Sequence, residues 1–88
     1  MNETAINEAI TAQVRFAPGG TVQPVAFVWR GRVRRLAGLG RQWTEHDDRD
    51  EWRCFLAHTT TGDTVELHWN RRSDEWRLRR AWWHLPAA

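Results

Sequence analysis

Tryptophan and arginine side chains recur side by side along the chain, and their chemistry is the most distinctive that the sequence offers. The 88 residues include seven Trp and no Tyr, and all thirteen basic residues are Arg. An exposed indole can stack on an unpaired base, and a guanidinium binds a phosphate through two parallel hydrogen bonds. The pairing fits a nucleic-acid-binding surface and also a small core that needs large apolar side chains. Trp and Arg are adjacent in Trp29-Arg30, Trp52-Arg53 and Trp76-Arg77, and one residue separates them in Trp69-Asn70-Arg71.

Two sets of arginines are the candidate contacts to nucleic acid. No acidic residue interrupts the first set, which consists of Arg30, Arg32, Arg34, Arg35 and Arg41. The second set, in the final hairpin, consists of Arg71, Arg72, Arg77, Arg79 and Arg80, with Trp83 on the outer face if Trp82 points inward. Two basic sets on one curved sheet would form a groove for a single strand. The alternative is that these arginines solvate a thin sheet and pair with its acids, while most of the tryptophans are buried.

Acidic residues crowd the segment that follows the first basic set. They are Glu45, Asp47, Asp48, Asp50 and Glu51. The chain has eleven acidic residues in all, so its net charge is only +2. Such a segment repels phosphate. With His46 it could offer ligands to calcium or magnesium, but its spacing matches no metal-binding loop, and a solvated turn explains it more simply. We therefore predict no metal and no cofactor.

The sequence offers no residues for hydrolytic or transfer chemistry. His58, His68 and His84 are scattered, and we expect His68 on the solvent face opposite Arg77. Ser73 is the only serine. Cys54 is the only cysteine, so an internal disulfide is excluded. Because its neighbours are apolar, we interpret it as a small core residue, and a reactive thiol is the alternative. We predict that the protein is not an enzyme.

The elements that would position these side chains are mainly strands. The length suits one domain, which we place at 13–84, with a flexible or short helical lead-in at 1–12 and a tail at 85–88. Val14 and Phe16 alternate as in a short strand that ends at Pro18-Gly19-Gly20. A second strand over 25–30 reverses tightly at Gly31.

The segment 33–43 is open to two interpretations. Val33, Leu36, Leu39 and Trp43 have nearly helical spacing, but Gly38 lies among them. We favour a strand that bulges near Leu36 and leaves the sheet through its glycines, and a short helix is the alternative.

Alternation is clearest in the last third of the chain. The predicted core faces are Trp52, Cys54 and Leu56, then Val65, Leu67 and Trp69, then Trp76, Leu78 and Trp82. Residues 60–63 form a turn, and we expect Trp69 opposite Trp76, Leu67 opposite Leu78 and Glu66 opposite Arg79. The predicted fold is mainly β: an antiparallel meander of five or six strands that curls into a sheet or a small half-open or closed barrel.

The stretch Phe27-Val28-Trp29-Arg30-Gly31-Arg32 and the spacing of the later tryptophans resemble a small bacterial domain of unknown function. That domain occurs alone and is similar to the C-terminal tail of some Y-family polymerase-like proteins of translesion mutagenesis. The resemblance covers roughly residues 13–83. It supplies no catalytic residues, and it implies a context of DNA repair.

Together these observations predict a non-enzymatic accessory domain of DNA repair or replication that binds single-stranded or damaged nucleic acid through Arg and exposed Trp. The alternative is a protein-interaction module or homodimer that engages a polymerase-like partner without touching nucleic acid. No apolar run is long enough to span a membrane, and Glu3 and Glu8 do not suit a secretory signal. We therefore expect a cytoplasmic protein without a membrane partner.

Overall fold

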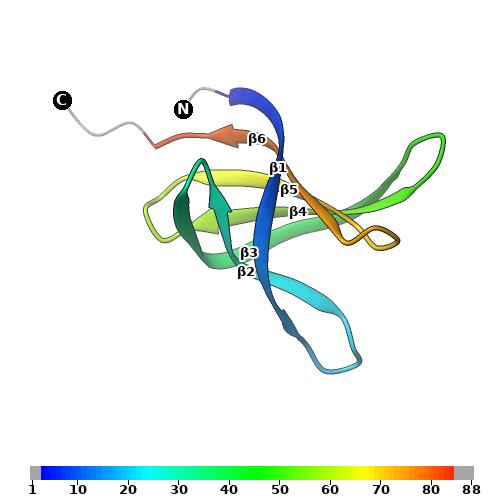
Figure 1. The fold of residues 1–88 in the computed structure, drawn as a ribbon. Helices are drawn as coiled ribbons and strands as arrows, with labels where there is room; N and C mark the ends of the chain where they lie inside the picture. The colour runs from blue at the N-terminus through cyan, green and yellow to red at the C-terminus, as the bar shows by residue number, and fades with distance from the viewer. Residues whose placement is uncertain (1–2, 85–88) are drawn as a thin grey trace.

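The computed structural model describes residues 3–84, which form six antiparallel strands closed into a small barrel (Figure 1). Each strand pairs with the next in the chain, and the first pairs with the last. The predicted meander is therefore confirmed, and the barrel is closed. The predicted tail at 85–88 lies outside the described residues. The strands are β1 (Glu3–Phe16), β2 (Val22–Trp29), β3 (Arg32–His46), β4 (Glu51–Thr59), β5 (Thr64–Asn70) and β6 (Glu75–Trp82).

Strand β1 closes the barrel, so the short helix predicted as one form of the lead-in is not supported at residues 3–12, which form a strand. Its first half pairs with β6, where Glu3 faces Trp82 and Ile10 faces Trp76. Ile6 and Ile10 pack against the core, but Glu8 lies between them and hides the alternation of apolar residues. The Glu8 carboxylate accepts hydrogen bonds from Trp29 Nε1 (3.0 Å) and from Arg30 (2.9 Å), which satisfy this acid in its half-buried position.

The β2–β3 hairpin and the long strand β3 follow the favoured prediction in part. Arg30 and Gly31 both have positive φ, 51° and 75°, as a two-residue hairpin turn of the primed type requires. The register shifts after Leu36 confirm a bulged strand rather than a helix. The strand does not leave the sheet at its glycines, however. It pairs with β2 up to Arg35 and then with β4 as far as His46, so it bends from one neighbour to the other.

Strands β5 and β6 pair as predicted at one end and differ at the other. Trp69 faces Trp76 and Leu67 faces Leu78, but Glu66 faces Arg80 instead of Arg79, because the register shifts between Glu66 and Leu67. A bulge inserts one residue and reverses the faces of those that follow. This is why Trp83 packs against the core, whereas the sequence pattern had assigned the inward position to Trp82.

The core face of β4 is the opposite of the predicted one. Phe55 and Ala57 belong to the core, whereas Cys54 is buried outside this hydrophobic cluster. Both faces of this strand carry apolar side chains, so alternation alone could not separate them. The pairing of β4 with β5 determines which face of β4 is in the core, because Phe55 is opposite Leu67, whose side chain points into the barrel. Other core members are Phe27, Val65, Trp76, Leu78 and Ala81.

Candidate functional site

Part of the first basic set gathers at a depression that we call the arginine pocket. The β2–β3 hairpin and the β4–β5 turn meet there, and the Thr60 N–H donates to the Arg35 carbonyl at 2.9 Å. Arg32 and Arg35 are exposed, and within residues 3–84 neither forms an ion pair with a carboxylate. The pocket is lined by Gln13, Arg32, Val33, Arg34, Arg35, Thr60 and Thr61.

Arg34 is the inward member of this pocket. Its guanidinium lies 4.8 Å from the Trp83 ring and 5.5 Å from the Trp29 ring, and these two indoles stack 5.4 Å apart. Its nearest carboxylate is that of Asp63, at 3.7 Å. The Arg34 Nε–H is buried and has no hydrogen-bond partner among the described residues. Arg34 is therefore partly structural, and Trp83, predicted as an outward contact, packs beneath it.

Arg30 and Arg41 each stack on a tryptophan of the same hairpin or strand. Arg30 lies 4.5 Å from the Trp29 ring and pairs with Glu8 at 2.9 Å. Arg41 lies 5.2 Å from the Trp43 ring. The hydrogen bonds from Arg30 and then from Trp29 lower the pKa of Glu8. Arg30 thus already has an anionic partner, whereas Arg41 keeps its charge available to solvent.

Most arginines of the second set are bound to groups of the protein itself. Arg72 pairs with Asp50 (2.7 Å), Arg77 with Glu75 (2.7 Å), and Arg80 with Glu66 (3.2 Å). Arg79 donates to Asn7 (2.8 Å), and Arg71 lies exposed beside Arg53 and Trp69. Arg77 and Arg79 line one pocket and Arg71 another, and neither pocket contains an arginine of the first set. The members of the two predicted sets that line these depressions therefore do not share one.

The acidic segment closes the β3–β4 hairpin. One oxygen of Asp47 accepts the N–H groups of Arg49 (2.9 Å) and Asp50 (2.7 Å), and the other accepts Trp52 Nε1 (2.9 Å). The hydrogen bonds from Arg49, Trp52 and Asp50 hold the pKa of Asp47 below its usual value. The pKa of Asp50 is likewise lowered, chiefly by Arg72.

We expect Asp47→Ala to lower the urea midpoint of unfolding at pH 6, because three donors lose their acceptor. The pKa of Asp47 is lower in the folded state, so its contribution is complete above the unfolded pKa of about 3.9 and disappears as the pH falls through the folded value. The difference between wild type and variant should therefore shrink below about pH 4. Asp48→Ala in the same turn is the control. Equal decreases in the urea midpoint for both variants would show that the charge of the turn, and not the hydrogen bonds of Asp47, sets the stability difference.

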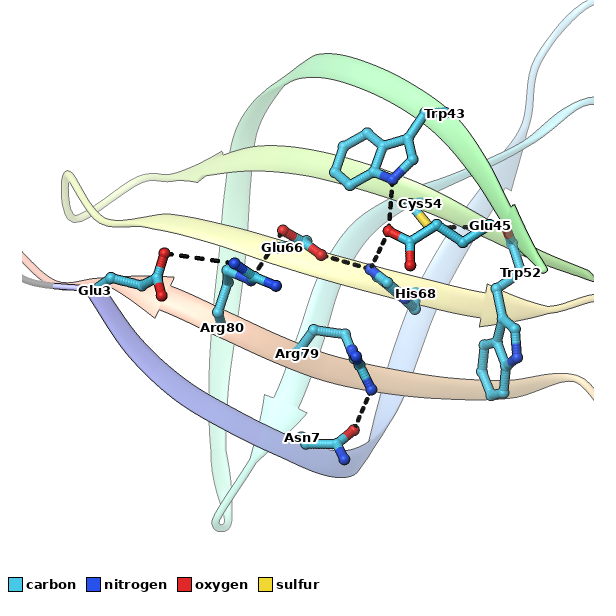
Figure 2. A network of polar contacts seen from close by, with 10 residues as sticks. All are labelled: Glu3, Asn7, Trp43, Glu45, Trp52, Cys54, Glu66, His68, Arg79 and Arg80. Atoms are coloured by element: carbon cyan, nitrogen blue, oxygen red, sulfur yellow. Dashed lines mark hydrogen bonds and ion pairs between the residues drawn. The ribbon is translucent and has the colours of Figure 1, made fainter. Parts of the chain in front are cut away.

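A second polar site lies on the outer face of the sheet, and we call it the polar cluster: Glu45, Cys54, Glu66 and His68 (Figure 2). Cys54 of β4 and His68 of β5 are direct cross-strand partners. Ligand atoms of Glu45, Cys54 and His68 lie within 4.8 Å of one another. His68 Nε2 is 2.6 Å from Glu66 Oε2 and 4.0 Å from Glu45 Oε2.

Neighbouring side chains hold the two carboxylates of the cluster. Trp43 Nε1 donates to Glu45 Oε2 at 2.8 Å, and Arg80 lies between Glu66 (3.2 Å) and Glu3 (3.5 Å). The cluster adjoins a pocket that is lined by Asn7, Glu45, His46, Asp47, Trp52, His68, Arg77 and Arg79. The polar cluster is therefore a supported network at the edge of a depression.

Burial controls the protonation of the two deepest groups. Cys54 is 0% and His68 is 4% exposed. Desolvation lowers the pKa of His68. Desolvation, followed by the charges of Glu45 and Glu66, raises the pKa of Cys54 to about 12. The thiol is therefore protonated at neutral pH.

We expect Cys54 to resist a thiol-specific disulfide reagent in the folded protein. Raising the pKa from 9.0 to about 12 lowers the thiolate fraction at pH 7.5 by roughly a thousandfold, and burial slows the reaction further. The reagent releases a coloured thiolate for each cysteine that it modifies, and this release is measured in a buffer that contains EDTA. It should be slow without urea, and it should be rapid and reach one equivalent per chain in about 8 M urea, which denatures the protein. Fast labelling of the folded chain would contradict the burial of this thiol.

The sequence patterns did not reveal the polar cluster. His68 does lie opposite Arg77 as predicted, but it is buried rather than on a solvated face. Cys54 was assigned to the core. The available signal was the pair Glu66 and His68, two residues apart on one face of β5. Its meaning depends on the register with β4, which brings Cys54 beside His68.

No family model, curated protein or solved structure matches the chain. Within residues 3–84, the structure contains no helix that is long and apolar enough to cross a membrane.

Proposed function

We propose that the protein is a non-enzymatic accessory domain of DNA repair or replication that binds single-stranded or damaged nucleic acid at the arginine pocket. One observation carries the proposal. Arg32 and Arg35 present exposed guanidinium groups without carboxylate partners among residues 3–84. Such groups suit the phosphate oxygens of a nucleic acid backbone.

The surroundings of the arginine pocket suit a single strand. Thr60 and Thr61 offer hydroxyl groups to phosphate or sugar, and Val33 is an exposed apolar side chain between the arginines. Farther along β3, Arg41 and Trp43 offer a charge and a half-buried indole. The acidic turn at the far end of β3 would repel phosphate, which favours binding at the end near the pocket.

Affinity for a single-stranded oligonucleotide should depend on salt. Each phosphate contact contributes a slope of about −0.7 to the logarithmic salt dependence, so two or three contacts predict a loss of roughly 7- to 20-fold between about 50 and 200 mM salt. Binding can be followed by tryptophan fluorescence. No quenching, or an affinity that does not change with salt, would refute the proposal.

A second candidate, a protein-interaction module or homodimer, is favoured by a different surface. Strands β2 and β3 pair over only four positions, from Ala26 opposite Arg35 to Trp29 opposite Arg32. Beyond Ala26, residues Gln23 to Val25 of β2 line a depression and are not paired with β3. Phe16, at the end of β1, is 75% exposed. An open strand edge beside an exposed aromatic side chain suits pairing with another chain. A dimer by light scattering, together with no oligonucleotide binding, would support this candidate.

A further inference from the structure

We propose that the polar cluster binds a divalent transition-metal ion, with zinc as the best match. Glu45, Cys54 and His68 would be the protein ligands, and Glu66 would occupy or support the fourth position. The site lies on the outer face of β3–β5, and its residues are separate from the arginine pocket. The inference does not depend on nucleic acid binding.

The chemistry of the donors selects the metal. A thiolate, an imidazole nitrogen and a carboxylate suit zinc or cobalt, whereas calcium and magnesium prefer oxygen ligands alone. Zinc bonds of about 2.0–2.3 Å in a tetrahedral site place neighbouring ligand atoms about 3.3–3.8 Å apart. The ligand atoms of Glu45, Cys54 and His68 already lie within 4.8 Å of one another. A contraction of at most about 1.5 Å would complete the site.

The barrel holds two of the ligands and leaves the third adjustable. Cys54 and His68 are direct cross-strand partners with buried side chains, so their positions are set by the sheet. The Glu45 side chain is 49% exposed and is oriented by Trp43 Nε1. Glu45 can therefore move the short distance that coordination needs without repacking of the core. Figure 2 shows Glu45 and Glu66 both directed toward His68.

Charge balance favours a cation in the cluster. Zinc would displace the proton of the Cys54 thiol, which passes to solvent, and the resulting thiolate would lie near Glu45 and Glu66. Of these negative groups, Glu66 pairs with Arg80, which is shared with Glu3. A divalent ion would compensate the remaining charge. Coordination through His68 Nε2 would require the tautomer that carries its hydrogen on Nδ1, with the Nε2 proton given to solvent and one taken up at Nδ1. The hydrogen bond to Glu66 would then be lost, and the Glu66 oxygen, 2.6 Å from Nε2 in the metal-free structure, would face the metal.

Cobalt titration of the full chain, without oligonucleotide, tests the site directly. Cys54 is the only cysteine, so a thiolate-to-cobalt charge-transfer band can arise from no other residue. We expect a band that saturates at one cobalt per chain and disappears when zinc is added. No such band in the wild-type chain would overturn the proposal, and this readout requires no variant to fold.

Two variants and a control identify the ligands. Competition with a chromophoric zinc chelator should show at least about tenfold weaker zinc binding for Cys54→Ser and for Glu45→Gln, the size of loss expected when a ligand or its support is removed. His58→Ala, a change at an exposed histidine of β4, should retain wild-type affinity. Because Glu45 is half exposed, its variant tests the site even if Cys54→Ser fails to fold. Equal zinc affinity of Glu45→Gln and His58→Ala would exclude Glu45 as a ligand and overturn the assigned site.

Discussion

Replacing Arg32 and Arg35 together by Glu is expected to weaken binding of a single-stranded oligonucleotide about 100-fold at about 50 mM salt. Each charged hydrogen bond to phosphate contributes about 1.5 kcal/mol, and a 100-fold loss corresponds to about 2.7 kcal/mol. Both side chains are exposed and have no carboxylate partner among residues 3–84. The change should therefore leave the fold intact. The affinity can be measured by fluorescence anisotropy of a labelled oligonucleotide.

Arg34 is unsuitable for this test, because it packs on Trp29 and Trp83 and pairs with Asp63. A matched control replaces Arg15 and Arg49 by Glu, which changes the net charge equally at exposed sites outside the arginine pocket. We expect this control to lose only a few-fold in affinity through long-range electrostatics. An equal loss in both double variants would show that only net charge matters. Unchanged affinity of the variant with Arg32 and Arg35 replaced would show that nucleic acid binds at another surface, for example at the second basic set.

Phe55→Ala is expected to lower the free energy of unfolding by about 3–5 kcal/mol. Phe55 is fully buried, stacks on Trp76 at 5.8 Å and faces Leu67 across the sheet. Natural domains have total stabilities of only about 5–15 kcal/mol, so this variant should lie close to unfolding at room temperature. Urea denaturation followed by tryptophan fluorescence measures the change.

Leu56→Ala is the matched comparison, because Leu56 is the next residue of β4, is only partly buried and was assigned to the core face by alternation. We expect it to cost about 1–2 kcal/mol, less than Phe55→Ala, since the side chain is smaller and part of its surface is already in water. A larger loss for Leu56→Ala than for Phe55→Ala would show that β4 presents its other face to the core.

Much of the fold was predictable wherever local chemistry decides it. Gly31 follows Arg30 at a two-residue turn, and both residues adopt the positive φ that a tight hairpin needs. Residues 60–63 form the predicted turn, and Trp69 faces Trp76 because the loop between them sets the register. The last part of β1, around Val14 and Phe16, was predicted as a strand. Its first part was missed because Glu8 occupies a half-buried position that an apolar residue would normally mark.

The candidate sites were less predictable, because their partners are distant in sequence. The absence of acids from 30–43 was only a partial guide: Arg32, Arg35 and Arg41 have no carboxylate partner in the described chain. Arg30 and Arg34 of the same stretch pair with the distant Glu8 and Asp63. Nothing local indicated that Asp50 would pair with Arg72, or that Arg80 would lie between Glu66 and Glu3. These contacts neutralise much of the second set and require the closed barrel.

Alternation and turn residues act over a few positions, so they were enough to predict an antiparallel meander, its tight turns and the register of the last hairpin next to its turn. Only the tertiary structure decided that β1 closes the barrel on β6 and that Phe55, not Cys54, faces the core. It also brought Glu45, Cys54 and His68 together from three strands. Sheet pairing joins residues far apart in the chain, and a single bulge, as at Arg79, reverses which side chains point inward.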